Sequence, residues 1–513
     1  MLSTVERMAV IDMGSNSFRL VVFGYERGRQ WKLIDEIREP VRVSAGMGDE
    51  QLLRPAPVER ALGTAAVFAA FCRASGVTDI AAVATSAIRD ARNGEELLAE
   101  IRERTALDPR VISGEDEARF AYLAIVNSTT LEDGCGVEIG GGSAQLMRIR
   151  GRRLEHADSF PLGAVRVSER FLSGEKASGK GMKALRHHVG EAIARDPWFS
   201  AETGGRLAGV GGALRNLATA AQKVAGHPAT DVGGFILKRD SLDDLIDELA
   251  SRPSSKRGSV PGIKPDRGDV ILGAALVLDE LMDAGDFEGV EITEAGLREG
   301  IFFERLLAPA DPPLFDDVRR DSVCNLARQF GFEPQHVHHV AKLSLEIYDG
   351  LAAVGVLDWD RVERELLWAA CNLHDIGVAI DYDDHHKHSH YLIWNAGLPG
   401  FTPRELILVA LIARYHRKGD PDISELGPLE QEGDEHRLAL LSGIIRLAEQ
   451  LERSRDGAVA AVSIAANGAV RLEAEARDDA SVALWSARRN ADLLSGALGR
   501  PVEIDLRGEA GRA

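Results

Sequence analysis

The sequence predicts a protein of three parts: a two-lobed α/β half, a helical region, and a small α+β segment at the C-terminal end. Short apolar runs typical of strands alternate with stretches of helical period over about the first 300 residues. A glycine-rich motif occurs twice in that half, and a proline-rich segment at residues 307–313 separates it from an almost entirely helical pattern.

Length and composition favour several globular domains. The chain has 513 residues, of which 45% are apolar, and its formal net charge is −19. An excess of acidic groups argues against nucleic acid or an anionic membrane as a partner, because such binding depends on surplus Lys and Arg. A polyanionic substrate would therefore need a local basic cleft.

The cysteines and the apolar runs bear on the cellular compartment. Neither a disulfide framework nor a zinc knuckle is indicated, because the cysteines are widely spaced, at Cys72, Cys135, Cys324 and Cys371. We expect buried thiols in a reducing cytoplasm. The sequence contains no export signal and no run of about 18 uncharged apolar residues, so we expect a cytoplasmic protein without a membrane span.

Individual elements of the α/β half can be placed by periodicity. Apolar runs rich in β-branched residues predict strands at residues 9–11, 20–23, 80–84 and 137–139. A helical period predicts a helix over residues 57–71.

An internal repeat is the most informative feature of this half. VIDMGSNSFRL at residues 10–20 matches GVEIGGGSAQL at residues 136–146. Acids, glycines and serines coincide in register, as Asp12 with Glu138, Gly14 with Gly140 and Ser17 with Ser143. Each copy predicts a strand, an acidic residue, a glycine-rich turn and a second strand. A duplicated hairpin of this kind indicates two lobes around a cleft, which we place at residues 1–125 and 126–308.

These loops suit phosphate, because glycine lets the backbone approach closely while N–H groups and hydroxyls point into one concavity. A single such loop is often a plain β-turn, but two copies in register favour phosphate. Asp12 and Glu138 stand at the loop mouths, where a buried carboxylate needs a partner or a cation, and Mg²⁺ favours a few carboxylates together with phosphate oxygens. The acids at residues 115–117 lie at the start of a predicted helix. Their interaction with the helix dipole is enough, by itself, to explain acidic residues at these positions.

Taken together, the motifs resemble the exopolyphosphatase and guanosine-pentaphosphatase family over almost the whole chain. The motifs that carry the resemblance are DMGSNSFRL, EIGGGS, TSAIRDARN at residues 85–93, ISGEDEAR at 112–119, GVGGALRNLA at 209–218 and GLREG at 296–300. The resemblance implies two ribonuclease-H-like lobes of the actin-like superfamily. It also implies hydrolysis of terminal phosphates with Mg²⁺, or Mn²⁺ in its place, and a homodimer.

The same resemblance implies roles for single residues. Glu117 would be the general base, and Arg89 would clamp substrate phosphate rather than form a surface salt bridge. Asp12 and Glu138 would hold the metal. The donors to successive phosphates would be Ser15, Asn16, Ser17, Gly141, Gly142 and Ser143.

Two positions depart from the family pattern. Glu138 stands where aspartate is usual, and Gln145, which could reach the metal through water, stands where glutamate is usual. We expect weaker metal binding or a lower rate from these changes. Arg19, just beyond the first loop, is expected to pair with a nearby acid.

The helical region, residues 314–457, contains nine of the fourteen histidines between His336 and His416. His374 and Asp375 follow an apolar helix, which resembles an HD phosphohydrolase domain. The resemblance implies a second divalent-metal site, with His386 and His416 as further contacts and with the ligands His336, His374, Asp375 and Glu449, the last in place of the usual aspartate. A purely architectural domain is the alternative.

Basic residues also gather in this region, at 385–388 and 414–418. Two interpretations stay open: a positive surface along the path of a long polyphosphate, or a solvated helix end. The final segment, residues 458–513, predicts a β-β-α-β unit, because an Asn467-Gly468 turn lies between two alternating runs, a helix passes through Trp485 and a strand occupies residues 502–506.

The favoured function is hydrolysis of inorganic polyphosphate, because the long C-terminal half favours that substrate over guanosine pentaphosphate. One alternative is a guanosine pentaphosphate phosphohydrolase. A second is a sensor that binds guanosine penta- or tetraphosphate without turnover, which the residues at 138 and 145 keep open. A third, an ATP-dependent kinase of the same superfamily, lacks a clear sugar-site motif.

Overall fold

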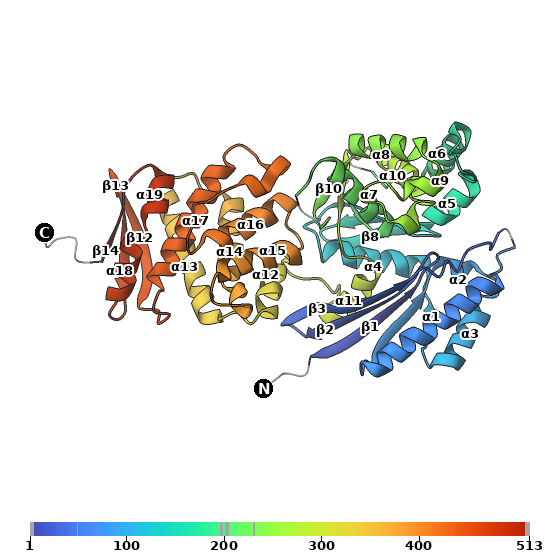
Figure 1. The fold of residues 1–513 in the computed structure, drawn as a ribbon, viewed down its shortest axis with the longest axis horizontal. Helices are drawn as coiled ribbons and strands as arrows, with labels where there is room; N and C mark the ends of the chain where they lie inside the picture. The colour runs from blue at the N-terminus through green and yellow to red at the C-terminus, as the bar shows by residue number, and fades with distance from the viewer. Residues whose placement is uncertain (1–4, 49, 195–197, 201–204, 229–230, 508–513) are drawn as a thin grey trace. The chain divides into compact units, whose positions relative to one another are not determined.

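The computed structural model describes residues 5–48, 50–194, 198–200, 205–228 and 231–507. Two compact units make up the chain: almost all of the sequence before Arg319 belongs to one unit, and residues 319–507 form the body of the other (Figure 1). The boundary lies close to the proline-rich segment at residues 307–313.

The first lobe contains a five-stranded mixed sheet in the order β3-β2-β1-β4-β5. The first three strands are antiparallel neighbours, and the last two run parallel to β1. The strands are β1 (Glu6–Met13), β2 (Phe18–Glu26), β3 (Gln30–Glu39), β4 (Asp79–Ala84) and β5 (Arg110–Val111).

The second lobe repeats this plan in a sheet ordered β10-β11-β9-β6-β7-β8. Its strands are β6 (Gly134–Ile139), β7 (Ala144–Arg150), β8 (Arg153–Phe160), β9 (Leu207–Val210), β10 (Phe235–Lys238) and β11 (Gly289–Ile292). Here again three antiparallel strands precede two parallel ones, with β10 added at the edge. The repeated order confirms the predicted pair of ribonuclease-H-like lobes and the strand–loop–strand form of both motif copies.

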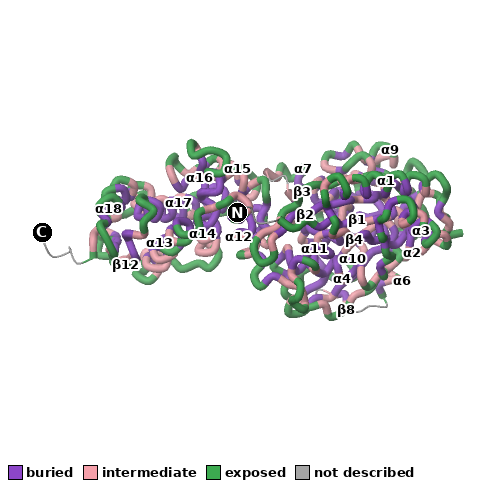
Figure 2. The backbone as a smooth tube through the Cα atoms, turned by 90° about the horizontal axis from the view of Figure 1, so that it is seen from below, coloured by how far each residue is buried: buried purple, intermediate pink, exposed green. Residues whose placement is uncertain are grey.

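Helices cover both faces of the first sheet. Helices α1 (Pro55–Ala74) and α3 (Gly94–Thr105) pack on one face, while α4 (Gly114–Val126) and α11 (Leu297–Leu307) pack on the other. Side chains of β1 alternate between these layers, because successive residues of a strand point to opposite faces. Phe302 of α11 stacks on Phe23 with ring centroids 4.1 Å apart. The buried strands and helices of both lobes are purple in Figure 2.

The second sheet has the same two-faced packing. Alternate residues of β6, such as Val137, pack in a core with helices α7 (Gly212–Val224) and α10 (Ile271–Gly285). Gly136, the neighbour of Val137 on β6, lies on the opposite face of the sheet and faces Ile125 of α4. Helix α4 therefore contacts both sheets. The remaining elements of this half are α2 (Ser86–Asp90), α5 (Ala164–Phe171), α6 (Gly179–Ile193), α8 (Arg239–Ser251), α9 (Ser254–Arg257) and η2 (Pro265–Arg267).

The second unit begins as a helical bundle. It contains α12 (Val318–Gln329), α13 (Pro334–Ala353), α14 (Arg361–Leu373), η3 (Ile376–Ala379), α15 (His385–Ala396), α16 (Pro403–Tyr415), η4 (Ser424–Leu429) and α17 (Asp434–Leu451). A capping box starts α16, where Thr402 and Glu405 satisfy each other's backbone N–H groups. The predicted helical region is thus confirmed in its secondary structure.

A three-stranded sheet, β12-β13-β14, completes this unit. Its elements are β12 (Val459–Asn467), β13 (Ala469–Ala476), α18 (Ser481–Arg488), α19 (Asp492–Leu498) and β14 (Val502–Leu506). The prediction of a single helix here was wrong. The Asn490 side chain donates a 2.8 Å hydrogen bond to the Ser486 carbonyl oxygen in the last turn of α18. This bond gives that carbonyl a partner from outside the helix and favours a break before α19.

Candidate active site between the two lobes

Strand parity places two predicted acids on the same side of their sheets. Asp12 shares the face of Met8 and Val10, which pack toward α4 and α11. Glu138 shares the face of Gly136, which also looks toward α4. Both carboxylates therefore face the layer between the sheets.

Helix α4 brings the third acid to the same place. Ser113 caps the helix and forms a capping box with Asp116, whose backbone N–H donates a 3.0 Å hydrogen bond to Ser113 Oγ. Glu115 is exposed, whereas Glu117 is only 6% exposed. The acids at residues 115–117 therefore differ in role. Helix capping accounts for Asp116 but does not account for the buried Glu117.

Glu117 is paired with a cation. Arg89 Nη1 donates a 2.6 Å hydrogen bond to Glu117 Oε2 and a 2.9 Å hydrogen bond to the carbonyl oxygen of Ile112. Burial raises the pKa of Glu117 to about 7, because the opposing effect of Arg89 does not cancel it and the nearby charges of Asp12 and Asp90 add to it. A carboxylate with this pKa can exchange protons near neutral pH.

Asp12 and Glu138 have no such partner: in the described part of the chain, neither side chain forms an ion pair or a hydrogen bond. Burial raises the pKa of Asp12, and burial with the charges of Glu117 and Asp12 raises the pKa of Glu138 to about 8. Unpaired carboxylates that repel one another fit a hard divalent cation, which takes oxygen ligands and would relieve the repulsion.

The two glycine-rich loops approach each other across the cleft. Ser15 Oγ lies 3.1 Å from Ser86 Oγ at the start of α2. A Cβ atom on Gly142 would lie 2.4 Å from Ser86 Oγ, and one on Gly141 would lie 3.0 Å from Ser15 Cβ. A side chain at either glycine would press against the first lobe, so this close approach favours glycine at both positions.

Residues opposite the two acids differ between the repeat copies. Gln145 is the cross-strand neighbour of Glu138, and its amide nitrogen donates to Ser143 Oγ at 2.9 Å and Ser159 Oγ at 3.1 Å. Arg19 is the corresponding neighbour of Asp12. As predicted, it pairs with an acid: Arg19 Nη1 lies 3.5 Å from an oxygen of Glu36.

A basic cluster lines this cleft, and sequence reasoning missed most of it. Burial, with repulsion from neighbouring arginines, lowers the pKa of Arg19 to about 9 and that of Arg267 to about 10. Repulsion of this kind requires cations close together. Acids balance part of the charge, because Arg19 and Arg298 lie 3.5 and 3.1 Å from Glu36. We define the cleft cluster as Arg19, Arg38, Arg215, Lys264, Arg267 and Arg298. Two members could have been noticed in the sequence, because Arg215 and Arg298 lie inside the glycine motifs at residues 209–218 and 296–300.

Ion pairs join the lobes around the cleft. Arg166 of α5 pairs with Asp90 of α2, and its Nε donates a 2.9 Å hydrogen bond to the carbonyl of Gly142. The second loop is thus tied to the first lobe. Other pairs that cross between the lobes include Arg38 with Asp266 and Arg42 with Asp269.

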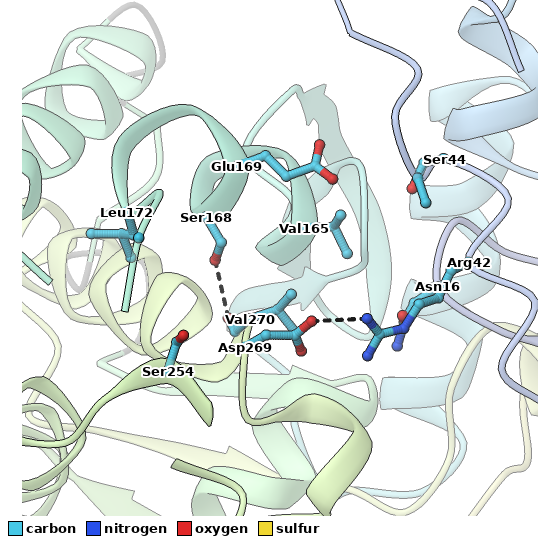
Figure 3. Close-up of a pocket in the computed structure, with 12 residues that line it drawn as sticks. Asn16, Arg42, Ser44, Val165, Ser168, Glu169, Leu172, Ser254, Asp269 and Val270 are labelled. Carbon is cyan, nitrogen blue, oxygen red and sulfur yellow. Dashed lines mark hydrogen bonds and ion pairs between the residues drawn. The ribbon is translucent and has the colours of Figure 1, made fainter. Parts of the chain in front are cut away.

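A pocket of about 210 Å³ lies between the lobes beside the first loop (Figure 3). Asn16, Arg42 and Ser44 form one wall, and Arg42 Nη1 lies 3.1 Å from Asp269 Oδ2 on the other. The second wall also contains Val165, Ser168, Glu169, Leu172, Ser254 and Val270. Asp12, Glu117 and Glu138 do not line this pocket.

Comparison with known proteins decides the family. The Ppx/GppA phosphatase family matches residues 21–308, and domain III of Ppx/GppA phosphatases matches residues 318–482. The chain belongs to the Ppx/GppA phosphatase family. The family resemblance of the motifs is thereby confirmed.

Solved structures of Ppx/GppA proteins resemble the first half. The Aquifex aeolicus family member is 25% identical, covers 59% of this chain and 98% of its own, and gives a TM-score of 0.51. An exopolyphosphatase-like protein is 26% identical, with 58% and 98% covered and a TM-score of 0.53. An exopolyphosphatase from Cytophaga hutchinsonii shares the fold at 20% identity, with 59% and 98% covered and a TM-score of 0.55. Among the described residues, no helix is both long and apolar enough to cross a membrane.

In domain III of this Ppx/GppA phosphatase, the four predicted metal ligands come together. His336 of α13, His374 and Asp375 at the end of α14, and Glu449 of α17 are all buried. His336 Nε2 lies 3.1 Å from Glu449 Oε2, and His374 Nε2 lies 3.4 Å from the same atom. His385, which sequence reasoning did not single out as a ligand, also lies here, with Nε2 at 3.2 Å from Asp375 Oδ1.

The predicted positive surface of domain III is reduced by its own contacts. Lys387 and Lys418 both pair with Asp384, at 2.8 and 3.0 Å. Burial lowers the pKa of His386 to about 4 and that of His416 to about 3, so both rings are neutral near pH 7. These histidines therefore add no charge to such a surface.

Proposed function

We propose that this Ppx/GppA phosphatase is an Mg²⁺-dependent exopolyphosphatase that releases orthophosphate from the end of inorganic polyphosphate. The observation that carries the proposal is the cleft cluster, in which six cations lie near two phosphate-type loops and are balanced only in part by Glu36, Asp266 and Glu294. The chain as a whole has a formal net charge of −19. Such a concentration of positive charge suits a substrate with many negative charges. An exopolyphosphatase-like protein of known structure shares 26% identity with the chain.

Glu117 is the general base in this proposal. A water molecule near its carboxylate attacks the terminal phosphorus, and Glu117 accepts the proton that the water releases. The bond from that phosphorus to the bridging oxygen breaks, so orthophosphate and a chain shortened by one phosphate form. Arg89, at 2.6 Å from Glu117, holds the carboxylate in place and offers its guanidinium to the terminal phosphate oxygens.

Asp12 and Glu138 are the residues that would hold Mg²⁺, because they are unpaired and face the same layer. When bound, the cation would offset negative charge on the phosphate oxygens as the P–O bond breaks.

The loops and the cleft cluster bind the rest of the chain. Backbone N–H groups and hydroxyls of Ser15, Asn16, Ser17, Gly141, Gly142 and Ser143 donate to the phosphates nearest the acids. Arginines of the cluster then bind later phosphates, for which a planar guanidinium is well suited. Because every phosphate of the polymer is alike, release of one leaves an equivalent end for the next cycle.

One observation favours a second candidate, binding of guanosine penta- or tetraphosphate without turnover. Gln145 opposite Glu138 is neutral, and its amide is held by Ser143 and Ser159. With Gln145 in place of a glutamate, the proposed metal site has one negative charge fewer. This change lowers the affinity for a cation more than it lowers the affinity for a polyanion.

The experiment is orthophosphate release by the full-length protein from long-chain polyphosphate and from guanosine pentaphosphate, each with Mg²⁺ and with a chelator. We expect Mg²⁺-dependent release with a higher kcat/KM for polyphosphate. A higher kcat/KM for guanosine pentaphosphate would replace the proposed substrate. Binding of either anion with no release would instead support the sensor.

A further inference from the structure

We propose that domain III holds a binuclear metal centre, in which Asp375 is shared between two divalent transition-metal ions. His336, His374, Asp375 and Glu449 bind the first ion, and Asp375, His385 and His416 bind the second. The centre lies wholly within the second unit and does not rest on the function proposed for the cleft.

Two ligand groups meet at one carboxylate. The potential ligand atoms of His336, His374 and Asp375 lie within 4.8 Å of one another, and so do those of Asp375, His385 and His416. Elements far apart in sequence supply them: α13, the end of α14, α15 and the end of α16. A shared carboxylate with histidines on both sides is an arrangement that serves two cations.

Several polar atoms in the cluster are buried without a hydrogen bond. They are both ring nitrogens of His336, Nε2 of His374, Oδ1 of Asp375 and Oε2 of Glu449. Leaving a buried polar atom without a hydrogen-bond partner is unfavourable. A cation bound by Nε2 of His336, Nε2 of His374, Oδ1 of Asp375 and Oε2 of Glu449 would satisfy one atom from each of these four residues.

The spacing fits metal ligation. Ligand bonds of about 2.0–2.2 Å hold neighbouring ligand atoms roughly 3.0–3.6 Å apart. For the first ion, His336 Nε2 and His374 Nε2 lie 3.1 and 3.4 Å from Glu449 Oε2, within this range. Each lies 3.7 Å from an oxygen of Asp375, just beyond it. For the second, His385 Nε2 lies 3.2 Å from Asp375 Oδ1 and 3.1 Å from His416 Nε2.

Backbone carbonyls fix the tautomers of three rings. Nδ1 of His374, His385 and His416 lies 2.7, 2.9 and 2.7 Å from the carbonyl oxygen three residues earlier in each case. Each Nδ1 therefore carries the proton and donates it, which leaves the lone pair on Nε2. This is the support that metal-bound histidines usually have. The lone pairs of His385 and His416 face each other at 3.1 Å and need a cation between them.

Arg455 positions the shared carboxylate. Its Nη2 donates a 2.7 Å hydrogen bond to Asp375 Oδ2, and its Nη1 donates a 2.6 Å hydrogen bond to Glu333. Nitrogen-rich sites with carboxylates favour Mn²⁺, Fe²⁺, Co²⁺ or Zn²⁺ over Mg²⁺.

The test loads the full-length protein with Co²⁺ in excess Mg²⁺, which occupies oxygen-only sites and competes weakly for histidine. After removal of loose metal, we expect about two Co²⁺ per wild-type chain, about one for His416→Gln and none for Asp375→Asn. The control, His436→Gln, replaces an exposed histidine of the same domain and should retain about two. One Co²⁺ or none in the wild type overturns the proposal, as does an unchanged count in His416→Gln.

A second measurement needs no variant and so does not depend on folding of a substituted chain. Wild-type protein is titrated with Mn²⁺ in excess Mg²⁺ and followed by electron paramagnetic resonance. We expect the second equivalent to produce an exchange-coupled spectrum, because one carboxylate bridges both ions. A spectrum of uncoupled Mn²⁺ at two equivalents contradicts the shared ligand.

Discussion

Arg89 Nη1 donates a 2.6 Å hydrogen bond to Glu117 Oε2, across 28 residues of sequence. This contact joins α2 to the first turn of α4, and it opposes the effect of burial on the carboxyl group. The protonation state of the proposed base therefore depends on one guanidinium.

Replacing that guanidinium should change the pH profile. In Arg89→Gln, burial acts on Glu117 without an adjacent cation, so its pKa rises above about 7. Because the base works only when ionised, the acidic limb of kcat/KM should move to higher pH by about 1 unit. The control is Arg92→Gln, an exposed arginine in the following turn. A lower rate with an unmoved limb would assign Arg89 to substrate binding alone.

Contact between the loops predicts a steric effect. In Gly142→Ala, the new Cβ would lie 2.4 Å from Ser86 Oγ and 3.1 Å from Ser86 Cβ, so the second loop and the start of α2 must separate. We expect kcat/KM for phosphate release to fall about a hundredfold while the melting temperature changes little. Adding Ser86→Gly should restore part of the rate. Gly179→Ala, in open space at the start of α6, is the control, and equal loss in both alanine variants would refute the steric account.

Metal affinity should respond to the residue opposite Glu138. Gln145→Glu adds a carboxylate beside a cation site that is otherwise one charge short, so half-maximal activity should need about tenfold less Mg²⁺. Activity is measured against free Mg²⁺ at saturating polyphosphate. If the Mg²⁺ requirement stays the same or increases, Gln145 has no part in metal binding.

The cleft cluster predicts a loss of substrate affinity. Arg267→Gln removes a partly buried cation, and KM for long polyphosphate should rise about tenfold with kcat nearly unchanged. The rise should shrink as salt increases. Arg150→Gln, at the exposed end of β7, is the matched control. A fall in kcat at constant KM would place Arg267 with the reacting groups instead.

The fold was largely predictable because its sequence signals are local and repeated. Alternating apolar runs located β1, β2, β4 and β6, and the duplicated acid-glycine motif indicated two lobes. Parity along β1 and β6 then determines that Asp12 and Glu138 face the same layer. The break between α18 and α19 was missed because it depends on one side-chain contact, Asn490 to Ser486, that periodicity does not reveal.

The sites were only partly predictable. Sequence motifs identified Glu117 and Arg89 but not their direct contact, which requires α2 and α4 to be packed together. Lys264 and Arg267 lie outside every motif, so only the folded cleft shows that they join Arg215. In domain III, His385 and His386 are adjacent in sequence, and the rotation of α15 decides that His385 faces Asp375.

The most direct test of the account compares Glu117→Gln with the wild type in phosphate release from long-chain polyphosphate with Mg²⁺, while polyphosphate binding is measured in parallel. Glutamine keeps the size of the side chain but cannot accept the proton. The account predicts a loss in kcat of at least about a hundredfold with binding retained. A variant that releases phosphate at close to the wild-type rate would contradict the assignment of Glu117 as the base.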